Sequence, residues 1–507
     1  MLRLPNVDLT TSTQRSHVGA DNRNVRLQYL RALAALAVLL FHVSGTIQRL
    51  SGVDSYIAIF NGYWGAYGVA IFFALSGYLM AELIRRDDAP HFLVSRLARI
   101  YPPLFLVVAL FSGALLAIGF PRGVDILGLS LIPAGGRDYF LNVEWTLVYE
   151  MTYYTALGAL AFLGLQRFAS AFAALWILLI LGRPLWGDGY EDNIVPVLSE
   201  LPWQTVNLPF LFGFLLRAIV ERHRLPPGIG VAALVAVIAA PYVIPGDVRV
   251  QTVIPAVLLV AAAVRAPLAK PGGALGRIGL KLGDASYVLY LSHIPLLLLL
   301  GSLLPTSLSA HLVFIGCSIA AILLSLVLAQ ADLGMHRSLK SMIARASAAR
   351  LRVVALGFIA VFAAVAVYAE RDVHTKRSAL ARAEAILSEA KVGAYATVRA
   401  EVDSADRLPD GSWLIRGYAI DLEKPGLVTH AAILQQGRIV AIDRMRRMRA
   451  AVAASLARPD LSSIRFGFAL SLPATTDCNA GPLEIRIALE DGRLVTPASE
   501  PMRNICN

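Results

Sequence analysis

Residues 28–48 read QYLRALAALAVLLFHVSGTIQ, an apolar stretch interrupted by Arg31 and His42. Because roughly 20 apolar residues cross the hydrocarbon of a bilayer, this stretch predicts a transmembrane helix. Successive helical residues are rotated by about 100°, so positions 11 apart return to within about 20° of the same direction. We therefore expect Arg31 and His42 on one face of the helix, separated along its axis by roughly 16 Å.

The whole chain has the composition of a membrane protein. Of its 507 residues, 57% are hydrophobic and 16% are charged, whereas roughly a quarter of the residues in soluble chains are charged. The formal net charge of +11 fits basic residues collected in cytoplasmic loops. We therefore expect a lipid bilayer around the protein and no nucleic acid as a partner. Residues 1–25 are polar and lack the apolar core of a signal peptide, so the first span is expected to direct insertion.

Ten further apolar stretches follow the first. The predicted spans are 28–48, 66–84, 101–120, 145–165, 168–184, 205–220, 229–245, 250–266, 284–304, 309–331 and 352–370. Counted together with the basic residues at the adjoining ends of the spans, loops after even-numbered spans hold 17 arginine and lysine residues, whereas loops after odd-numbered spans hold five. Because basic residues favour the cytoplasmic side, the N-terminus is predicted in the cytoplasm and the residues after 370 on the far side of the membrane.

The composition changes after the last span. Residues 376–391 predict a short amphipathic helix, and alternating stretches such as WLIRGYAI at 413–420 predict strands. We expect an all-α polytopic bundle followed by a small β-rich, sandwich-like extracytoplasmic domain. Cys317 lies in an apolar run, whereas Cys478 and Cys506 lie in the tail, where an oxidising compartment would favour a disulfide between them.

The predicted organisation is a polar tail at 1–25, a ten-span domain at 26–332, a basic cytoplasmic loop at 333–351, an eleventh span at 352–370, a helical linker at 371–394 and an extracytoplasmic domain at 395–507.

His42 is the leading candidate for catalysis. A neutral imidazole is an able general base near neutral pH, and a histidine inside a span suggests function because its burial is unfavourable. The structural alternative makes His42 a hydrogen-bonding strut between helices and Arg31 an anchor that reaches the membrane surface.

Glu150 is the predicted partner of His42. The fourth span opens Glu144-Trp145-Thr146 and runs inward, which puts Glu150 about 7–9 Å below the outer surface, near the depth of His42. A carboxylate there would orient the imidazole and hold its tautomer, as an acid does in a hydrolase triad. The alternative is a carboxylate satisfied by interfacial water.

The ninth span contains Ser286, Tyr290 and His293 near helical spacing, followed by Pro295. The proline frees a backbone carbonyl and is tolerated where a helix lines a cavity. His293 either contacts substrate or serves as a structural hydrogen-bonding group.

Arg96 and Arg99 lie three residues apart at the cytoplasmic edge of the third span, hence on one helical face. Paired guanidinium groups suit phosphate recognition, whereas the alternative is ordinary anchoring of the span by basic residues. The sequence has no zinc-type Cys/His spacing and no glycine-rich phosphate loop, so we expect no metal and no bound cofactor.

Five segments together resemble the acyltransferase 3 family of bacterial membrane acyltransferases over about residues 26–332. They are Arg31 with His42, Phe72-Phe73-Ala74-Leu75-Ser76-Gly77-Tyr78, Arg96-x-x-Arg99 before Ile100-Tyr101-Pro102, Trp145-Thr146-Leu147 before Glu150, and Ser286-Tyr287…Leu289-Tyr290-Leu291…His293…Pro295. The segments Leu27-Gln28-Tyr29-Leu30-Arg31-Ala32 and Tyr149-Glu150-Met151 look most like the branch that O-acetylates exopolysaccharides.

The resemblance implies transfer of an acyl group, usually acetyl, from cytoplasmic acyl-CoA to a sugar hydroxyl at the outer face of the bacterial inner membrane. The partners it implies are acyl-CoA and a carbohydrate acceptor. His42 then matches the essential histidine of the family and Arg31 its paired arginine. Arg96 and Arg99 match the arginine pair associated with acyl-CoA binding.

Glu150, Tyr287 and His293 match recurrent positions of the family. Some relatives carry an external hydrolase-like domain, but this tail lacks the Gly-Asp-Ser nucleophile pattern of that domain, so we expect it to bind or position a glycan.

The leading hypothesis is an acyl-CoA-dependent O-acyltransferase in which His42 deprotonates the acceptor, by direct transfer or through an acyl-enzyme on His42 or Ser76. A second hypothesis is a transporter or flippase for a glycan intermediate, since buried polar residues in ten spans would suit one. A third treats the tail as the functional module and the spans as its anchor.

Overall fold

A computed structural model describes residues 24–120, 122–137, 139–185, 195–265, 273–305, 308–389, 397–407, 413–436, 438–445, 447–458, 460–461, 464–472, 481–490 and 494–496. The chain divides into two compact units, Met1–Arg371 and Asp372–Asn507. Each unit is described by itself.

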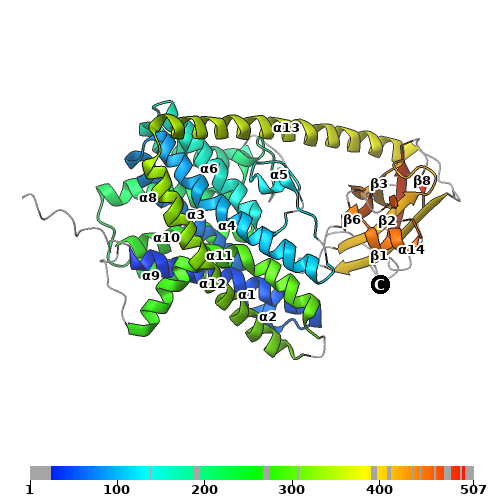
Figure 1. Cartoon of the computed structure of the whole chain (residues 1–507), viewed down its shortest axis with the longest axis horizontal. Helices are drawn as coiled ribbons and strands as arrows, with labels where there is room; N and C mark the ends of the chain where they lie inside the picture. Colours follow the sequence, from blue (N-terminus) through cyan, green and yellow to red (C-terminus); the bar gives the residue numbers. More distant parts are fainter. Residues whose placement is uncertain are drawn as a thin grey trace, which may run out of the picture. The chain divides into compact units, whose positions relative to one another are not determined.

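The first unit is helical (Figure 1). Its helices are α1 (Val25–Ser51), α2 (Ser55–Ile59), α3 (Gly62–Arg86), α4 (Ala89–Ala117), α5 (Ile126–Leu129), α6 (Glu144–Phe162), α7 (Ala169–Gly182), α8 (Leu208–Arg222), α9 (Ile229–Val243), α10 (Val248–Arg265), α11 (Gly273–Leu303), α12 (Ala310–Arg345) and the part of α13 (Ala348–Glu389) that precedes Asp372. Every predicted span overlaps one of these helices.

In the described part of the chain, seven helices are long and apolar enough to cross a membrane: α1, α3, α4, α10, α11, α12 and the Ala348–Thr375 portion of α13. The protein is therefore a multi-pass membrane protein. The other four predicted spans coincide with α6, α7, α8 and α9, which are shorter or less apolar, so the count of eleven stays a prediction.

The segment after the tenth predicted span differs from the expected organisation. α13 runs without a break from Ala348 to Glu389, so the predicted eleventh span and the helix predicted after it form one element. Likewise, α12 continues to Arg345, so most of the predicted basic loop at 333–351 is helical. The physical reason is that no proline interrupts either junction, and a single glycine such as Gly334 costs a helix only about 1 kcal/mol.

α1 and α11 pack closely and run parallel. A Cβ atom on Gly283 would lie 2.5 Å from the carbonyl oxygen of Gln28, and one on Gly301 would lie 3.6 Å from the side chain of Leu50. Residues 28 to 50 of α1 thus follow residues 283 to 301 of α11 in the same direction. The small residues allow the two backbones to approach.

α3 and α8 form a second close contact. A Cβ atom on Gly77 would lie 2.0 Å from the carbonyl oxygen of Phe210, and one on Gly213 would lie 2.1 Å from that of Ala74. Arg85 forms an ion pair with Glu221 at 2.6 Å near the C-terminal ends of both helices. The helices α3 and α8 therefore also run parallel. A Cβ atom on Gly68 of α3 would likewise lie 2.6 Å from the carbonyl oxygen of Ala34 in α1. Small residues of α3 therefore lie where it packs against α1 and α8.

The second unit is β-rich, as predicted. Its described strands are β1 (Val398–Arg407), β2 (Trp413–Asp421), β3 (Val428–Gln435), β4 (Arg438–Arg444), β5 (Arg447–Met448), β6 (Arg465–Leu472), β7 (Leu483–Leu489) and β8 (Leu494–Val495), with α14 (Ala450–Ser455) between β5 and β6. They form two antiparallel sheets, ordered β1-β2-β6-β5 and β4-β3-β7-β8.

The two sheets share one hydrophobic core. Ile415 and Phe468 from the first sheet pack with Ile433 and Ile487 from the second, and all four are fully buried. The alternation of inward apolar and outward polar side chains along these strands produces this core.

Candidate active site

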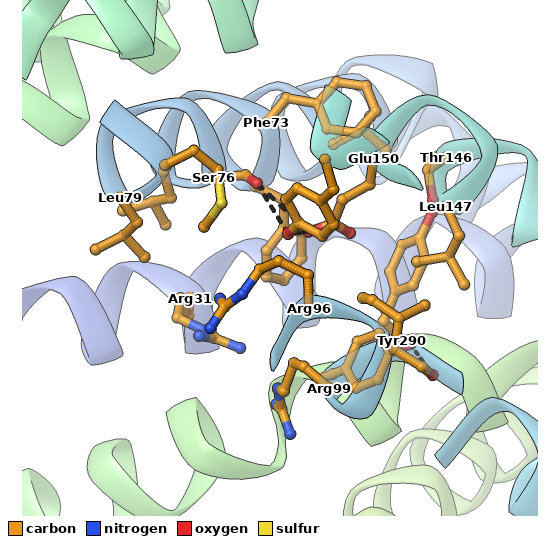
Figure 2. A pocket seen from close by; sticks show the side chains of 17 residues that line it. Arg31, Phe73, Ser76, Leu79, Arg96, Arg99, Thr146, Leu147, Glu150 and Tyr290 are labelled. Carbon is orange, nitrogen blue, oxygen red and sulfur yellow. Dashed lines mark hydrogen bonds between the residues drawn. The ribbon is translucent and has the colours of Figure 1, made fainter. Parts of the chain in front are cut away.

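A cavity of about 140 Å³ lies within the helical unit (Figure 2). Its lining residues come from α1, α3, α4, α6 and α11: Arg31, Val69, Phe72, Phe73, Leu75, Ser76, Leu79, Met80, Arg96, Arg99, Ile100, Thr146, Leu147, Glu150, Tyr154, Tyr287 and Tyr290. The predicted catalytic and binding residues therefore meet at this cavity, with the exception of His42 and His293.

Three arginines occupy one side of the cavity, whereas Thr146 and Tyr290 lie toward the other (Figure 2). Arg31 donates from Nε to the hydroxyl of Ser286 at 3.2 Å. Arg96 has a buried Nε that makes no hydrogen bond within the described chain. Arg31 and Arg96 thus bring positive charge to the cavity, and neither forms an ion pair with a carboxylate in the described chain.

Arg99 is bound differently from Arg96. Its Nη1 pairs with the carboxylate of Asp332 in α12 at 2.8 Å, and its guanidinium lies 5.0 Å from the centre of the Tyr287 ring. Tyr287 donates its hydroxyl hydrogen to the carbonyl oxygen of Ile100 at 2.9 Å. Arg99 is therefore held by its own helical unit, although it borders the same cavity.

Glu150 contacts hydroxyl groups and not His42. Ser76 donates to its Oε1 at 3.3 Å, and Tyr154 donates to the same oxygen. Within the described chain, Glu150 makes no hydrogen bond with His42, so the predicted triad-like pairing does not form. Glu150 borders the cavity together with Arg31 and Ser76, whereas His42 does not line it.

His42 instead contacts His293. Nδ1 of His42 lies 2.9 Å from the carbonyl oxygen of Val38 and 3.2 Å from Nε2 of His293. Nδ1 of His293 lies 3.0 Å from the carbonyl oxygen of Leu289. His293 is buried at 1% exposure, whereas His42 is only partly buried.

The histidine pair lies behind one wall of the cavity. Neither imidazole lines the cavity, but Tyr290 does, and the centre of its ring lies 5.9 Å from that of His293. Tyr290 and Thr146 share a hydrogen bond of 2.8 Å across α11 and α6. Tyr290, with Thr146 as its hydrogen-bond partner, therefore lies between the cavity and His293.

The polar residues of the ninth span all bond to other helices. Ser286, Tyr290 and His293 contact three different partners, which are Arg31, Thr146 and His42. Because Arg31 and His42 both meet α11, they share one face of α1, as their spacing predicts.

Three residues of the site are not predicted as functional by the sequence. Tyr154 lies four residues after Glu150, and residues four apart are neighbours on the surface of a helix. This spacing is the signal that could have identified Tyr154 as a partner of the carboxylate. Asp332 is an isolated acid at the end of an apolar stretch, which is itself a functional signal. Thr146 gives no signal of its own, because a threonine in a span commonly bonds its own backbone.

The cysteine predictions have separate outcomes. Cys317 is a buried free thiol in α12. Cys478 and Cys506 lie outside the described residues. Among the residues that the structure describes, no cluster of three or more histidine, cysteine or acidic side chains is arranged to hold a metal ion.

The helices that build the cavity and the histidine pair correspond to a known domain. Residues 24–330 match the acyltransferase 3 family, described as an acyltransferase domain. The chain belongs to this family. The resemblance inferred from the five segments is thereby confirmed, and the protein is an acyltransferase.

Two relatives are similar to parts of this acyltransferase. Exopolysaccharide production protein ExoZ from Rhizobium meliloti strain 1021 is 28% identical over 254 residues, which cover 45% of this chain and 75% of the relative. Nodulation protein 10 from Rhizobium leguminosarum biovar viciae is 31% identical over 132 residues, which cover 25% of this chain and 35% of the relative. No solved structure matches the chain.

Proposed function

We propose that this acyltransferase moves an acetyl group from acetyl-CoA in the cytoplasm to a hydroxyl group of an exported polysaccharide or its lipid-linked precursor. The observation that carries the proposal is a cavity lined by arginines, one of whose lining residues, Tyr290, packs against His293 of the His42–His293 pair. The cavity suits an anionic donor, and the histidine suits deprotonation of an alcohol.

The donor is assigned from the charges of the cavity. Coenzyme A carries phosphates, and guanidinium groups bind phosphate oxygens through paired N–H donors. Arg31 and Arg96 are the arginines of the cavity that have no carboxylate within ion-pair distance in the described structure, so they are the donor-binding groups. Glu150 is held by hydrogen bonds from Ser76 and Tyr154, and its carboxylate limits the excess of positive charge beside Arg31 and Arg96.

The orientation follows from basic residues and helix directions. Arg96, Arg99 and the Arg85–Glu221 pair lie at ends of spans predicted to face the cytoplasm. In the predicted topology, two odd-numbered or two even-numbered spans cross the membrane in the same direction. The parallel helices α1 and α11 are the first and ninth spans, and the parallel helices α3 and α8 are the second and sixth, which agrees with this rule. The N-terminus is then cytoplasmic and the second unit extracytoplasmic, in the bacterial inner membrane.

The chemical step uses His42 as a general base. Nε2 of His42 takes the proton of the acceptor hydroxyl, and the hydroxyl oxygen forms a bond to the thioester carbonyl carbon. The carbon–sulfur bond breaks, and the imidazolium returns its proton to the departing thiolate. The products are an O-acetyl ester and free coenzyme A, so no external proton or electron is required.

The acceptor is assigned from the printed name of a relative and from the second unit. ExoZ is an exopolysaccharide production protein, which favours a polysaccharide acceptor here. The two sheets with a shared core are typical of a β-sandwich, and we assign the unit at 395–507 to binding or positioning the glycan.

The test replaces His42 with alanine in the full-length protein. Mass spectrometry of surface polysaccharide should show loss of acetyl groups, while the variant inserts into the membrane in normal amount. His223→Ala is the matched control, because His223 is an exposed histidine at the end of α8. Acetylation retained by His42→Ala would overturn the mechanism.

A further inference from the structure

We infer that His293 is a positioning residue that fixes the tautomer of His42, rather than a group that binds substrate. This inference rests on the proposed function, in which His42 accepts the proton of the acceptor. The geometry that supports it is the contact of 3.2 Å between Nε2 of His293 and Nδ1 of His42.

The backbone assigns a hydrogen to one nitrogen of each ring. A carbonyl oxygen can only accept, so the oxygen of Val38 at 2.9 Å requires a hydrogen on Nδ1 of His42. The oxygen of Leu289 at 3.0 Å requires a hydrogen on Nδ1 of His293 in the same way. A neutral imidazole carries one N–H, so Nε2 is the acceptor on both rings.

The contact between the rings then has one direction. Nδ1–H of His42 is shared between the Val38 carbonyl and the lone pair of Nε2 of His293. The opposite tautomer of His42 would place its Nδ1 lone pair against two other lone pairs, which is repulsive. His293 therefore favours the form of His42 in which Nε2 is free to accept a proton, and within the described chain that nitrogen has no hydrogen-bond partner.

The surroundings hold His293 in place. Its side chain is 1% exposed and packs against Tyr290, which forms the wall of the donor cavity. The close approach of α1 and α11 at Gly283 fixes the distance between the two histidine-bearing helices. Because His293 does not line the cavity and is covered from solvent, it is not placed to touch the donor, which favours the hydrogen-bonding role over the substrate contact that its sequence position also allows.

The same contact acts during the reaction. After Nε2 of His42 has taken the acceptor proton, the ring is an imidazolium, whose Nδ1–H is a stronger donor than that of the neutral ring. Nε2 of His293 accepts this stronger hydrogen bond without moving. The stabilisation is thus larger when His42 is protonated than when it is neutral, which is the condition for an effect on kcat.

The experiment compares three substitutions of His293 in the full-length purified protein. Gln places its amide oxygen near the position of Nε2, Asn places its oxygen near Nδ1, and Leu offers no acceptor. Transfer from acetyl-CoA to polysaccharide purified from cells that lack the gene is followed by release of the coenzyme A thiol. We expect His293→Gln to keep kcat within about 10-fold, and His293→Asn and His293→Leu to lose about 100-fold or more.

The KM for acetyl-CoA should stay within about threefold in all three variants, because His293 lies outside the donor cavity. Equal kcat for the Gln and Asn variants, or a Leu variant with normal kcat, would overturn the inference. Should the Leu variant fail to fold, the Gln and Asn pair decides the question, because both are polar and differ only in reach. If His42→Ala loses transfer and His293→Leu keeps it, the role of His293 is rejected and the proposed function stands. If His42→Ala keeps transfer, the proposed function itself is rejected.

Discussion

Arg99 forms an ion pair with Asp332 at 2.8 Å, although it lies one helical turn from Arg96, whose Nε has no hydrogen-bond partner in the described chain. The two arginines look equivalent in the sequence, but the structure divides them. One is paired with a carboxylate from α12 that is 2% exposed, and the other lines the cavity with no ion pair to a carboxylate in the described chain.

This division predicts different effects of replacing the two arginines. Arg96→Ala should weaken acetyl-CoA binding by about 2 kcal/mol, the contribution of a hydrogen bond to a charged group, with little loss of thermal stability. Arg99→Ala should lower the free energy of unfolding by about 3 kcal/mol, because it leaves the buried Asp332 carboxylate without its partner. Calorimetric binding and thermal unfolding in detergent measure the two effects.

A paired substitution serves as the control for Arg99. Arg99→Met combined with Asp332→Leu removes both charges and should recover most of the stability lost by Arg99→Ala. A double variant that is no more stable than the single one would show that the ion pair is not the reason for the loss.

Ser76 and Tyr154 donate to the same oxygen of Glu150, so their contributions should be coupled. Ser76→Ala and Tyr154→Phe each leave the carboxylate with one of these donors, whereas the double variant leaves it with neither. A double-mutant cycle on acetyl-CoA binding should give a coupling energy of about 1 kcal/mol. Additive effects would mean that the two hydroxyl groups act independently of the carboxylate.

Tyr290 should restrict the acyl chain that can reach His42. Its ring separates the donor cavity from the histidine pair, so Tyr290→Ala should enlarge the passage. Butyryl is longer than acetyl by two methylene groups, and we expect the ratio of kcat/KM for butyryl-CoA to that for acetyl-CoA to rise at least about 10-fold, the low end of the discrimination that one methylene gives. Tyr290→Phe is the control, because it keeps the ring and removes only the hydroxyl bonded to Thr146. An unchanged ratio in Tyr290→Ala would place the passage elsewhere.

Gly77 should not tolerate a side chain. A Cβ atom there would lie 2.0 Å from the carbonyl oxygen of Phe210, and backbone cannot move aside as a flexible side chain does. Gly77→Ala should therefore separate α3 from α8 and reduce the yield of folded protein on size-exclusion chromatography. Gly113→Ala in α4 is the matched control, since a Cβ atom there would meet nothing within 4 Å and alanine favours helix by about 1 kcal/mol. Equal yields of the two variants would contradict the close contact.

Local patterns in the sequence are enough to predict where helices and strands lie and the directions of side chains around each helix, although not the full lengths of α12 and α13. Arg31 and His42 share a face because the rotation per residue in an α-helix is constant, and the same periodicity brings Ser286, Tyr290 and His293 to neighbouring positions on α11. Alternation along strands likewise predicts the β-rich unit without any knowledge of which strands pair.

Which of these faces meet depends on packing between segments far apart in the chain. The sequence predicts similar depths for Glu150 and His42, but hydrogen bonding also requires that two helices turn their side chains toward each other. That rotation is set by contacts such as Gly283 against Gln28, which no local pattern encodes. For this reason His293, 251 residues from His42 in the sequence, is its partner in the fold, and Asp332 is the partner of Arg99.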